Sequence, residues 1–366
     1  MNGTIERERK IYNSGNLGNN NNKKRKKKRS ILKKIFITFI ILCFIGAGCL
    51  AALLYGPNHE FRDWLITTAM TTMNHQWIAH LFYSDATIDK VMKDNRIEEI
   101  DEDTNTDEII VGISKKNYEN EYERAILEKN NASDKYKIIE ISGKGYSGYL
   151  VAIYDPSKIH TLVTAKLGTS GQYLTTMAKN NKAIIAINGG GFEDPNFNSN
   201  GSDPLGVTYS KGKQYTAKAY GGSGGIIGFD NNDKLVLSTK CTAQSAKSLG
   251  IRDCVTCGPF LIVNGKASQV VGNGGWGIAP RTAIGQRKDG IVLFLVIDGR
   301  KIGRQGADMD DLIEVMQRYG AVNAANLDGG TSTALVVNYE IINDPIDSTG
   351  AHKTRFIATG FGLIDE

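Results

Sequence analysis

Hydrophobic residues are very unevenly distributed over the first 60 positions of the chain. Residues 1–34 are almost entirely polar, whereas residues 35–55 form 21 uncharged and mostly apolar positions. An α-helix rises about 1.5 Å per residue, so a helix of this length can cross a hydrocarbon core about 30 Å thick. The pattern therefore predicts a single transmembrane helix at residues 35–55.

The pattern between residues 56 and 134 indicates a helix followed by a linker. Apolar residues recur at helical spacing from Asp63 to Lys93, which predicts one helix that serves as a stalk. Residues 97–110 contain seven acidic residues and no basic residue, a composition typical of a solvated linker. A short helix is expected at 118–128, just before the next region.

From Lys135 onward, short runs rich in β-branched residues are separated by glycine and other turn residues. Strands are predicted at 136–141, 149–154, 160–166 and 183–187, and a helix at 175–180. A firmer helix is predicted from its N-cap Asp308 to Tyr319, because apolar residues line one face and Gly320 follows. This helix separates an apolar strand that ends at Asp298 from a second strand at 324–327.

These elements predict an α/β fold, with a mixed sheet of the α+β type, for an extracellular domain behind a single N-terminal transmembrane helix. Four regions are expected: a basic cytoplasmic tail (1–34), a transmembrane anchor (35–55), a helical stalk and acidic linker (56–134), and the main domain (135–366). In α/β sheets, ligands bind at the carboxyl ends of the strands. Residues that directly follow strands of the main domain are therefore the first candidates for a site.

The net charge of +5 belongs to the N-terminal tail. Residues 1–34 carry twelve Lys and Arg against two Glu, so the rest of the chain is acidic overall. A basic cluster directly before a membrane span keeps that end in the cytoplasm and contacts anionic lipid, so no nucleic-acid partner is expected. We expect an uncleaved anchor in the cell membrane, with signal-peptide cleavage near the small residues 46–49 as the alternative.

Three cysteines lie outside the predicted span: Cys241, Cys254 and Cys257. The spacing of the last two could form half of a metal or redox site, but no second cysteine pair or paired histidines accompany them. We expect either one disulfide with a cysteine left over or three free thiols.

Charged and amide side chains follow predicted strands or begin them at four places in the main domain. Arg281 precedes a strand, and its planar guanidinium suits bidentate binding of phosphate or carboxylate. Asp298 and Asp328 each follow a strand and could serve as base, nucleophile or metal ligand, while Asn188 could bond a sugar hydroxyl. Structural roles are the alternatives: an ion pair for Arg281 and turn formation for Asp298, Asp328 and Asn188.

Glycine-rich loops surround these candidates. Paired glycines permit close backbone approach and can form an anion-binding nest, to which neighbouring hydroxyl groups add donors. The candidate catalytic residues are Asp298 and Asp328, and the candidate substrate- or phosphate-binding residues are Asn188, Gly189, Arg281, Arg300, Gly329, Gly330, Thr331 and Ser332. Lys353 or Arg355 could add a phosphate contact, and Trp276, in a glycine-rich loop at 272–277, could stack on a sugar ring.

Four motifs in a fixed order resemble the phosphodiester glycosidase family. They are Asn188-Gly-Gly-Gly, Pro280-Arg281-Thr282, Ile297-Asp298-Gly299 and Asp328-Gly-Gly-Thr-Ser-Thr, and the resemblance extends over 135–366. It implies a hydrolase that cleaves the glycosidic bond of a sugar-1-phosphodiester. Its partner would be a phosphorylated carbohydrate or a cell-wall polymer, in cell-envelope or exopolysaccharide metabolism.

The same residues allow two alternative functions and a possible divalent cation. The pocket could belong to a non-catalytic module that binds anionic cell-surface polysaccharide. A serine hydrolase built on Ser223 is disfavoured, because an apolar strand and not a helix follows that glycine-rich turn. No cofactor is required by the pattern, although Asp298 and Asp328 could hold Ca²⁺ or Mg²⁺ through oxygen ligands.

Overall fold

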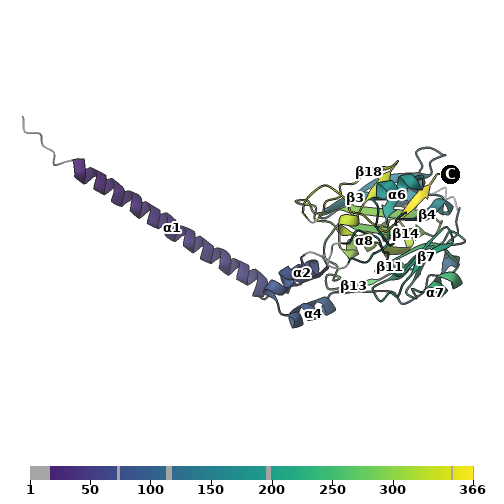
Figure 1. Cartoon of the computed structure of the whole chain (residues 1–366), viewed down its shortest axis with the longest axis horizontal. Helices are drawn as coiled ribbons and strands as arrows, with labels where there is room; N and C mark the ends of the chain where they lie inside the picture. The colour runs from purple at the N-terminus through teal and green to yellow at the C-terminus, as the bar shows by residue number, and fades with distance from the viewer. Residues whose placement is uncertain (1–16, 72–74, 113–117, 195–198, 348, 366) are drawn as a thin grey trace, which may run out of the picture. The chain divides into compact units, whose positions relative to one another are not determined.

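A computed structural model of the chain describes residues 17–71, 75–112, 118–194, 199–347 and 349–365 (Figure 1). It divides into two compact units, Met1–Arg62 and Asp63–Glu366. The first unit is dominated by α1 (Leu17–Tyr55). Within it, Ser30–Tyr55 is long and apolar enough to cross a membrane, by length and composition alone. The predicted helix is therefore confirmed. A signal sequence near the N terminus has the same length and composition, so the role of the helix as a membrane anchor is a proposal.

Among its described residues, the second unit contains most of α2, the helices α3 to α8, and nineteen strands. The helices are α2 (His59–Thr71), α3 (Gln76–Phe82), α4 (Asp85–Asp94), α5 (Glu121–Leu127), α6 (Leu174–Asn180), α7 (Ala243–Ser248) and α8 (Met309–Arg318). The first strands are β1 (Arg96–Glu98), β2 (Tyr136–Gly143), β3 (Tyr146–Ile153), β4 (Ile159–Val163), β5 (Ala183–Asn188), β6 (Val207–Ser210), β7 (Lys213–Ala217), β8 (Gly225–Asp230), β9 (Leu235–Ser238) and β10 (Ile251–Cys257). They are followed by β11 (Phe260–Val263), β12 (Lys266–Ala267), β13 (Gln269–Val271), β14 (Arg281–Arg287), β15 (Val292–Asp298), β16 (Ala321–Asn326), β17 (Leu335–Val337), β18 (Glu340–Ile341) and β19 (Thr359–Ile364).

A seven-stranded sheet with the order β12-β11-β16-β14-β15-β3-β2 forms the centre of this unit. Successive side chains of a strand point to opposite faces, so each strand serves two cores. In β15 the odd-numbered residues 293–297 pack with α8, whereas the even-numbered residues 292–296 pack with the other two large sheets. Helix α8 packs against β16 and β11. The long apolar strand is therefore buried on both faces.

Two five-stranded sheets complete the fold, with the orders β18-β17-β5-β19-β4 and β7-β6-β10-β8-β9, and β1 pairs with β13. Helix α6 packs against the first of these sheets and α7 against β10 of the second. The predicted mixture of helices and sheets is confirmed. The sheets are antiparallel at every strand pairing that the structure describes, not mixed.

Most predicted elements of the main domain are present. The strands expected at 136–141, 149–154, 160–166 and 183–187 correspond to β2, β3, β4 and β5, and the expected helices to α5, α6 and α8. Asp308 caps α8 as predicted: its side chain accepts from the Asp311 backbone, and the Asp311 side chain accepts from the Asp308 backbone. Local polar contacts and the apolar face of the helix therefore agree.

The single helix predicted from Asp63 to Lys93 is wrong, because the region forms the three helices α2, α3 and α4. Ser84 begins α4 by accepting a hydrogen bond from the Thr87 backbone N–H. A local cap thus restarts the helix where the apolar pattern alone suggested continuity.

Most residues of the acidic segment 97–110 are exposed, as expected, but hydrogen bonds attach the segment to the domain, so it is not a free linker. The Glu99 carboxylate accepts hydrogen bonds from the Phe260 N–H at 2.7 Å and the Gly224 N–H at 2.9 Å, and from the Ser223 hydroxyl. Asp103 accepts from Lys240 at 3.0 Å. The carboxylates satisfy backbone and lysine donors of the sheets, and this fixes the segment.

Cys241, Cys254 and Cys257 are free thiols. Burial raises the pKa of the Cys257 thiol to about 12. Such thiols are protonated at neutral pH and therefore poor nucleophiles.

Candidate active site

Three predicted site residues come to one edge of the seven-stranded sheet. Strands β15 and β16 both run antiparallel to β14, which lies between them, so the start of β14 and the ends of its neighbours coincide. Arg281 is the first residue of β14 and Asp298 the last of β15, while Asp328 follows β16 by two residues. The expected meeting of strand ends is thus achieved, but through antiparallel pairing and not through a parallel α/β sheet.

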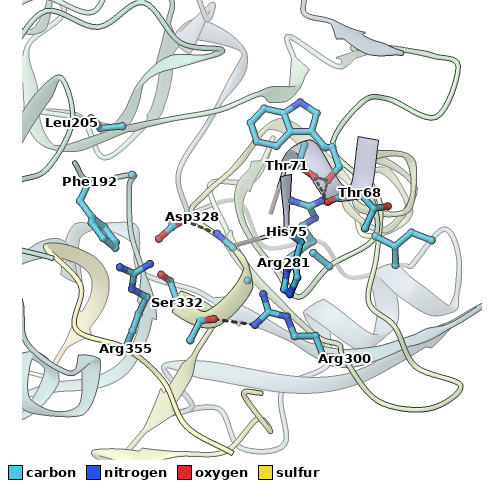
Figure 2. A pocket seen from close by; sticks show the side chains of 17 residues that line it. Thr68, Thr71, His75, Phe192, Leu205, Arg281, Arg300, Asp328, Ser332 and Arg355 are labelled. Atoms are coloured by element: carbon cyan, nitrogen blue, oxygen red, sulfur yellow. Dashed lines mark hydrogen bonds between the residues drawn. The ribbon is translucent and has the colours of Figure 1, made fainter. Parts of the chain in front are cut away.

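A cavity of about 320 Å³ opens beside this edge (Figure 2). Its lining residues are Thr68, Thr71, His75, Gly191, Phe192, Leu205, Trp276, Ile278, Ala279, Arg281, Arg300, Asp328, Gly329, Gly330, Thr331, Ser332 and Arg355. Seven of the ten candidate residues from the sequence are in this set. The other three, Asn188, Gly189 and Asp298, are not.

Asp328 is the one acidic residue among the described residues that line the cavity. Its Oδ1 accepts from the Gly329 backbone N–H at 3.0 Å, and Ser332 bonds the same carboxylate. Burial raises the pKa of Asp328 to about 6, against the opposing effects of the Ser332 hydrogen bond and the Arg355 charge. The carboxylate is thus more basic than an exposed one and is still mostly ionised at neutral pH.

Arg281 is 6 % exposed and is held by three backbone carbonyl groups. Its Nη2 donates to Trp276 O at 2.5 Å and Gly277 O at 2.7 Å, and its Nε donates to Ala307 O at 3.2 Å. Burial lowers the pKa of Arg281 to about 10 against the opposing charge of Asp308, and the neighbouring Arg300 charge adds to the lowering. The fixed orientation leaves Nη1 with no protein acceptor in the described part of the chain, on the side of Gly329.

Arg300 is the second guanidinium of the cavity and comes from the loop after β15. Its Nη1 donates to the Thr331 hydroxyl at 2.9 Å and to Ile346 O at 2.7 Å. The backbone at Arg300 has φ of 61°, a left-handed conformation that only a few non-glycine residues adopt. Burial lowers the pKa of this side chain as well. Neither Arg281 nor Arg300 has a carboxylate oxygen within 4.0 Å among the described residues.

Arg355 is a third guanidinium on the same lining, near Asp328 and Phe192 (Figure 2). Its Nη2 lies 2.8 Å from Asp194 Oδ2, and its guanidinium lies 4.7 Å from the centre of the Phe192 ring. Its charge is therefore already balanced by a buried carboxylate. The sequence offered Arg355 and Lys353 as alternatives; Lys353 instead pairs with Asp347 at 3.0 Å.

Asp298 is 8 % exposed and holds a loop. Its Oδ1 accepts from the Asn343 side chain at 2.9 Å and from the Asp344 backbone N–H at 3.0 Å. Burial raises the pKa of Asp298. The structure thus places this candidate beside the cavity edge with its carboxylate occupied by protein donors.

Asn188 and Gly189 also have protein partners. The Asn188 amide donates to Asp328 O at 2.6 Å, and its oxygen accepts from the Thr282 hydroxyl at 2.7 Å and the Ala334 N–H at 3.1 Å. Gly189 O accepts from the Asp328 N–H at 3.0 Å. Both residues therefore position the backbone of Asp328 from outside the cavity lining.

The two glycines after Asp328 line the cavity, but their amides are already used. Gly329 N–H donates to the Asp328 carboxylate, and Gly330 N–H donates to Pro280 O at 2.9 Å. The expected nest of free amides is not formed by these two groups. Gly330 has φ of 61°, which suits a residue without a side chain where the chain turns into the short helix Gly330–Ser332.

The wall formed by Thr68, Thr71 and His75 had no signal in the sequence, because these residues lie about 200 positions before their neighbours. Trp276, expected near the site, does line it. Ser223 is not among the lining residues, and its hydroxyl bonds Glu99. Within the described residues, no three His, Cys, Asp or Glu side chains gather as metal ligands would.

Comparisons with known proteins identify the family of this chain. Residues 181–364, just over half of the chain, match the family model for phosphodiester glycosidases. The SPbeta prophage-derived uncharacterized protein YomE of Bacillus subtilis (strain 168) is 29% identical over 202 residues, covering 53% of this chain and 30% of that protein. The N-acetylglucosamine-1-phosphodiester alpha-N-acetylglucosaminidase of Bos taurus is 36% identical over 70 residues, covering 19% and 13% respectively. The chain therefore spans less than a third of the length of either relative.

The fold is also found in a solved structure. It is the catalytic domain of zebrafish N-acetylglucosamine-1-phosphodiester alpha-N-acetylglucosaminidase, auto-inhibited by its pro-peptide. The similarity has a TM-score of 0.53 at 20% identity and covers 65% of this chain and 86% of that domain.

Proposed function

Because the chain belongs to the phosphodiester glycosidase family, we propose that its cavity hydrolyses the glycosidic C1–O bond of a sugar-1-phosphodiester. The observation that carries this proposal is the pair Arg281 and Arg300. Both are desolvated, both face the same cavity, and neither has a carboxylate partner among the described residues. The charges of Asp308 and Asp347 offset the desolvation of these two cations only in part, and an anionic ligand between the guanidinium groups would lower the remaining cost.

A phosphodiester fits these two residues better than a neutral sugar does. Arg281 is held by carbonyl groups so that its remaining N–H groups point toward Gly329, and Arg300 approaches from the Thr331 side. Guanidinium groups in fixed positions bind phosphate oxygens through short, charge-assisted hydrogen bonds. These contacts support a phosphate position between Arg281 and Arg300.

Asp328 is the proposed reacting carboxylate. In its ionised form it either takes a proton from the water whose oxygen bonds C1, or attacks C1 itself to form a glycosyl ester that a water molecule then hydrolyses to free sugar. The C1–O bond breaks as this new bond forms, and its electron pair leaves with the phosphate monoester. A phosphate monoester is a good leaving group, so a strong general acid matters less here than in other glycosidases. Both roles of Asp328 require the ionised form, and activity is therefore expected to rise as pH increases through about 6.

The setting of the reaction is proposed from the N-terminal unit. The basic tail followed by the apolar helix Ser30–Tyr55 supports a single-pass anchor with a cytoplasmic N terminus. The hydrolase would then act outside the cell on phosphorylated carbohydrate or cell-wall polymer of the envelope. Localisation of a tagged chain, with protease access from outside the cell, tests this orientation.

A panel of sugar-1-phosphodiesters tests the activity. The full-length chain in detergent is incubated with each diester, with and without EDTA, and free sugar and phosphate monoester are measured together. We expect equal amounts of both products from at least one diester. Saturable binding of the diesters without any product would instead favour the second candidate, a polysaccharide-binding module that uses the same two arginines. Loss of release in EDTA would assign a metal to the site.

A further inference from the structure

One wall of the cavity is built by residues outside the part of the chain that matches the family model. Thr68 and Thr71 lie in the last turn of α2, and His75 directly precedes α3. Figure 2 shows these three residues on the side of Arg281, away from Phe192 and Leu205. The cavity therefore has two ends, with Asp328 and the two unpaired arginines between them.

This wall is joined to the residue that is proposed to bind phosphate. The Asn273 side chain donates to the Thr67 hydroxyl at 3.0 Å, and the Thr71 hydroxyl, which donates to Thr67 O at 2.7 Å, also lies 3.2 Å from Trp276 O. The same Trp276 carbonyl accepts from Arg281 at 2.5 Å. Helix α2, the glycine-rich loop and Arg281 thus form one connected structure.

Close packing keeps α2 against this loop. Gly277 has φ of 60°, and a β-carbon there would lie 2.9 Å from Thr68 Cα. Only glycine combines that backbone conformation with that approach. The wall is thereby fixed directly beside the Arg281 guanidinium.

The position of C1 decides which part of a substrate reaches this wall. C1 must lie at Asp328, and the phosphate between Arg281 and Arg300. The sugar then occupies the end near Phe192 and Leu205. The alcohol on the other side of the phosphate, the aglycone, extends toward Thr71 and His75.

The wall is suited to an alcohol with several hydroxyl groups. The His75 imidazole faces the cavity, and no protein group bonds it in the described part of the chain. Thr71 has lone pairs left for a second hydrogen bond, and the Trp276 indole offers an apolar face. No acidic side chain lies on this wall among the described residues.

We propose that His75, with Thr71 and Trp276 beside it, forms the aglycone subsite and selects diesters whose alcohol is a polyol or a sugar. The assignment rests on the proposed function, since it takes the phosphate position from it. His75 is therefore a specificity-determining residue contributed by the N-terminal helical segment.

Two diesters with the same sugar-1-phosphate test the subsite, one esterified with methanol and one with a six-carbon polyol. In His75→Ala, kcat/KM for the polyol diester is expected to fall about fivefold to tenfold, the effect of one hydrogen bond. For the methyl diester it should stay within about twofold. His75→Gln keeps a hydrogen-bonding group and should recover part of the loss. His80→Ala is the control, because His80 is exposed on α3 and pairs with Asp85.

Equal losses of kcat/KM on both diesters would mean that His75 contacts the phosphate or supports the folded structure, and would overturn the aglycone assignment. No loss on either diester, or faster hydrolysis of both, would also overturn it. Dissociation constants of the intact diesters, measured with Asp328→Asn and with the double variant that adds His75→Ala, separate the two proposals. If the wild-type chain cleaves neither diester, the proposed function fails, while the ratio of dissociation constants still decides the subsite.

Discussion

Replacing Asp328 by Asn is expected to reduce kcat on the order of 10²–10⁴-fold, the usual contribution of a carboxylate that transfers a proton or attacks. Asn has nearly the same shape and can still accept from the Gly329 N–H, so the loop should keep its conformation. Only the negative charge and the basicity are removed. Turnover of the best diester, measured with the pure variant, gives the result directly.

The same substitution is expected to stabilise the protein at neutral pH. The pKa of Asp328 is about 6 in the folded chain, above its ordinary value near 4, so the folded state binds the proton more tightly than the unfolded state. This group therefore makes the free energy of unfolding decrease as pH rises from about 4 to about 6. Asn is neutral throughout. We expect Asp328→Asn to gain about 1–2 kcal/mol at pH 7.5, reduced because the cavity admits water, and nothing near pH 4.

Asp298→Asn is the matched comparison for this variant. Asp298 also follows the sheet edge and also has a pKa raised by burial, but its carboxylate bonds Asn343 and the Asp344 backbone. Its replacement should lower turnover less than about tenfold, because it disturbs only the loop at Asn343 and Asp344. A larger loss for Asp298→Asn than for Asp328→Asn would reverse the assignment of the reacting carboxylate.

Replacing Arg281 by Lys is expected to lower kcat/KM about 100-fold or more, although the charge is kept. Lysine cannot bond Trp276 O, Gly277 O and Ala307 O while also presenting N–H groups to the cavity. Removing one fixed donor that stabilises the charge developing on the phosphate typically lowers kcat on the order of 10²–10³-fold. Competitive inhibition by inorganic phosphate should weaken in parallel, because phosphate would bind the same guanidinium.

Arg287 provides the control on the same strand. It is 5 % exposed at the other end of β14, and its guanidinium pairs with Asp289 at 2.8 Å and with Glu123 at 3.5 Å. Arg287→Lys should lower the melting temperature but leave phosphate inhibition unchanged. If both variants weakened inhibition by phosphate equally, the effect of Arg281→Lys would reflect a general loss of structure and not the loss of a phosphate-binding group.

The central part of the site could be predicted because it depends on local sequence. Apolar runs of seven or so residues specify buried strands, and a charged residue next to a glycine-rich loop marks the point where a strand ends. Arg281, Arg300 and Asp328 occupy such points and do line the cavity. The direction of the strands is not local information, so the antiparallel sheet was not predictable in the same way.

Asp298 and Asn188 show the limit of this reasoning. A polar residue at a strand end has one signature in the sequence whether it faces a ligand or satisfies neighbouring backbone groups. Asn188 is fully buried and bonds Asp328 O, Thr282 and Ala334. Which of the two roles a residue takes depends on which loops fold over it.

The N-terminal segment shows a second limit. Thr71 and the acidic residue Glu99 are about 200 and 160 positions away from the residues that they contact, Trp276 and Phe260. Periodicity and charge content describe a segment alone, so they suggested a stalk and a solvated linker. Long-range contacts turned the same residues into a cavity wall and a structural anchor.

Hydrolysis in water enriched in oxygen-18 shows whether the C1–O bond or the P–O bond of the sugar-1-phosphodiester is broken. The diester that the panel shows to be cleaved fastest is hydrolysed by the full-length chain, and both products are analysed by mass spectrometry. Our account predicts the heavy oxygen in the released sugar and none in the phosphate monoester. Heavy oxygen in the phosphate would show that the P–O bond is broken instead, and would contradict the proposed glycosidase.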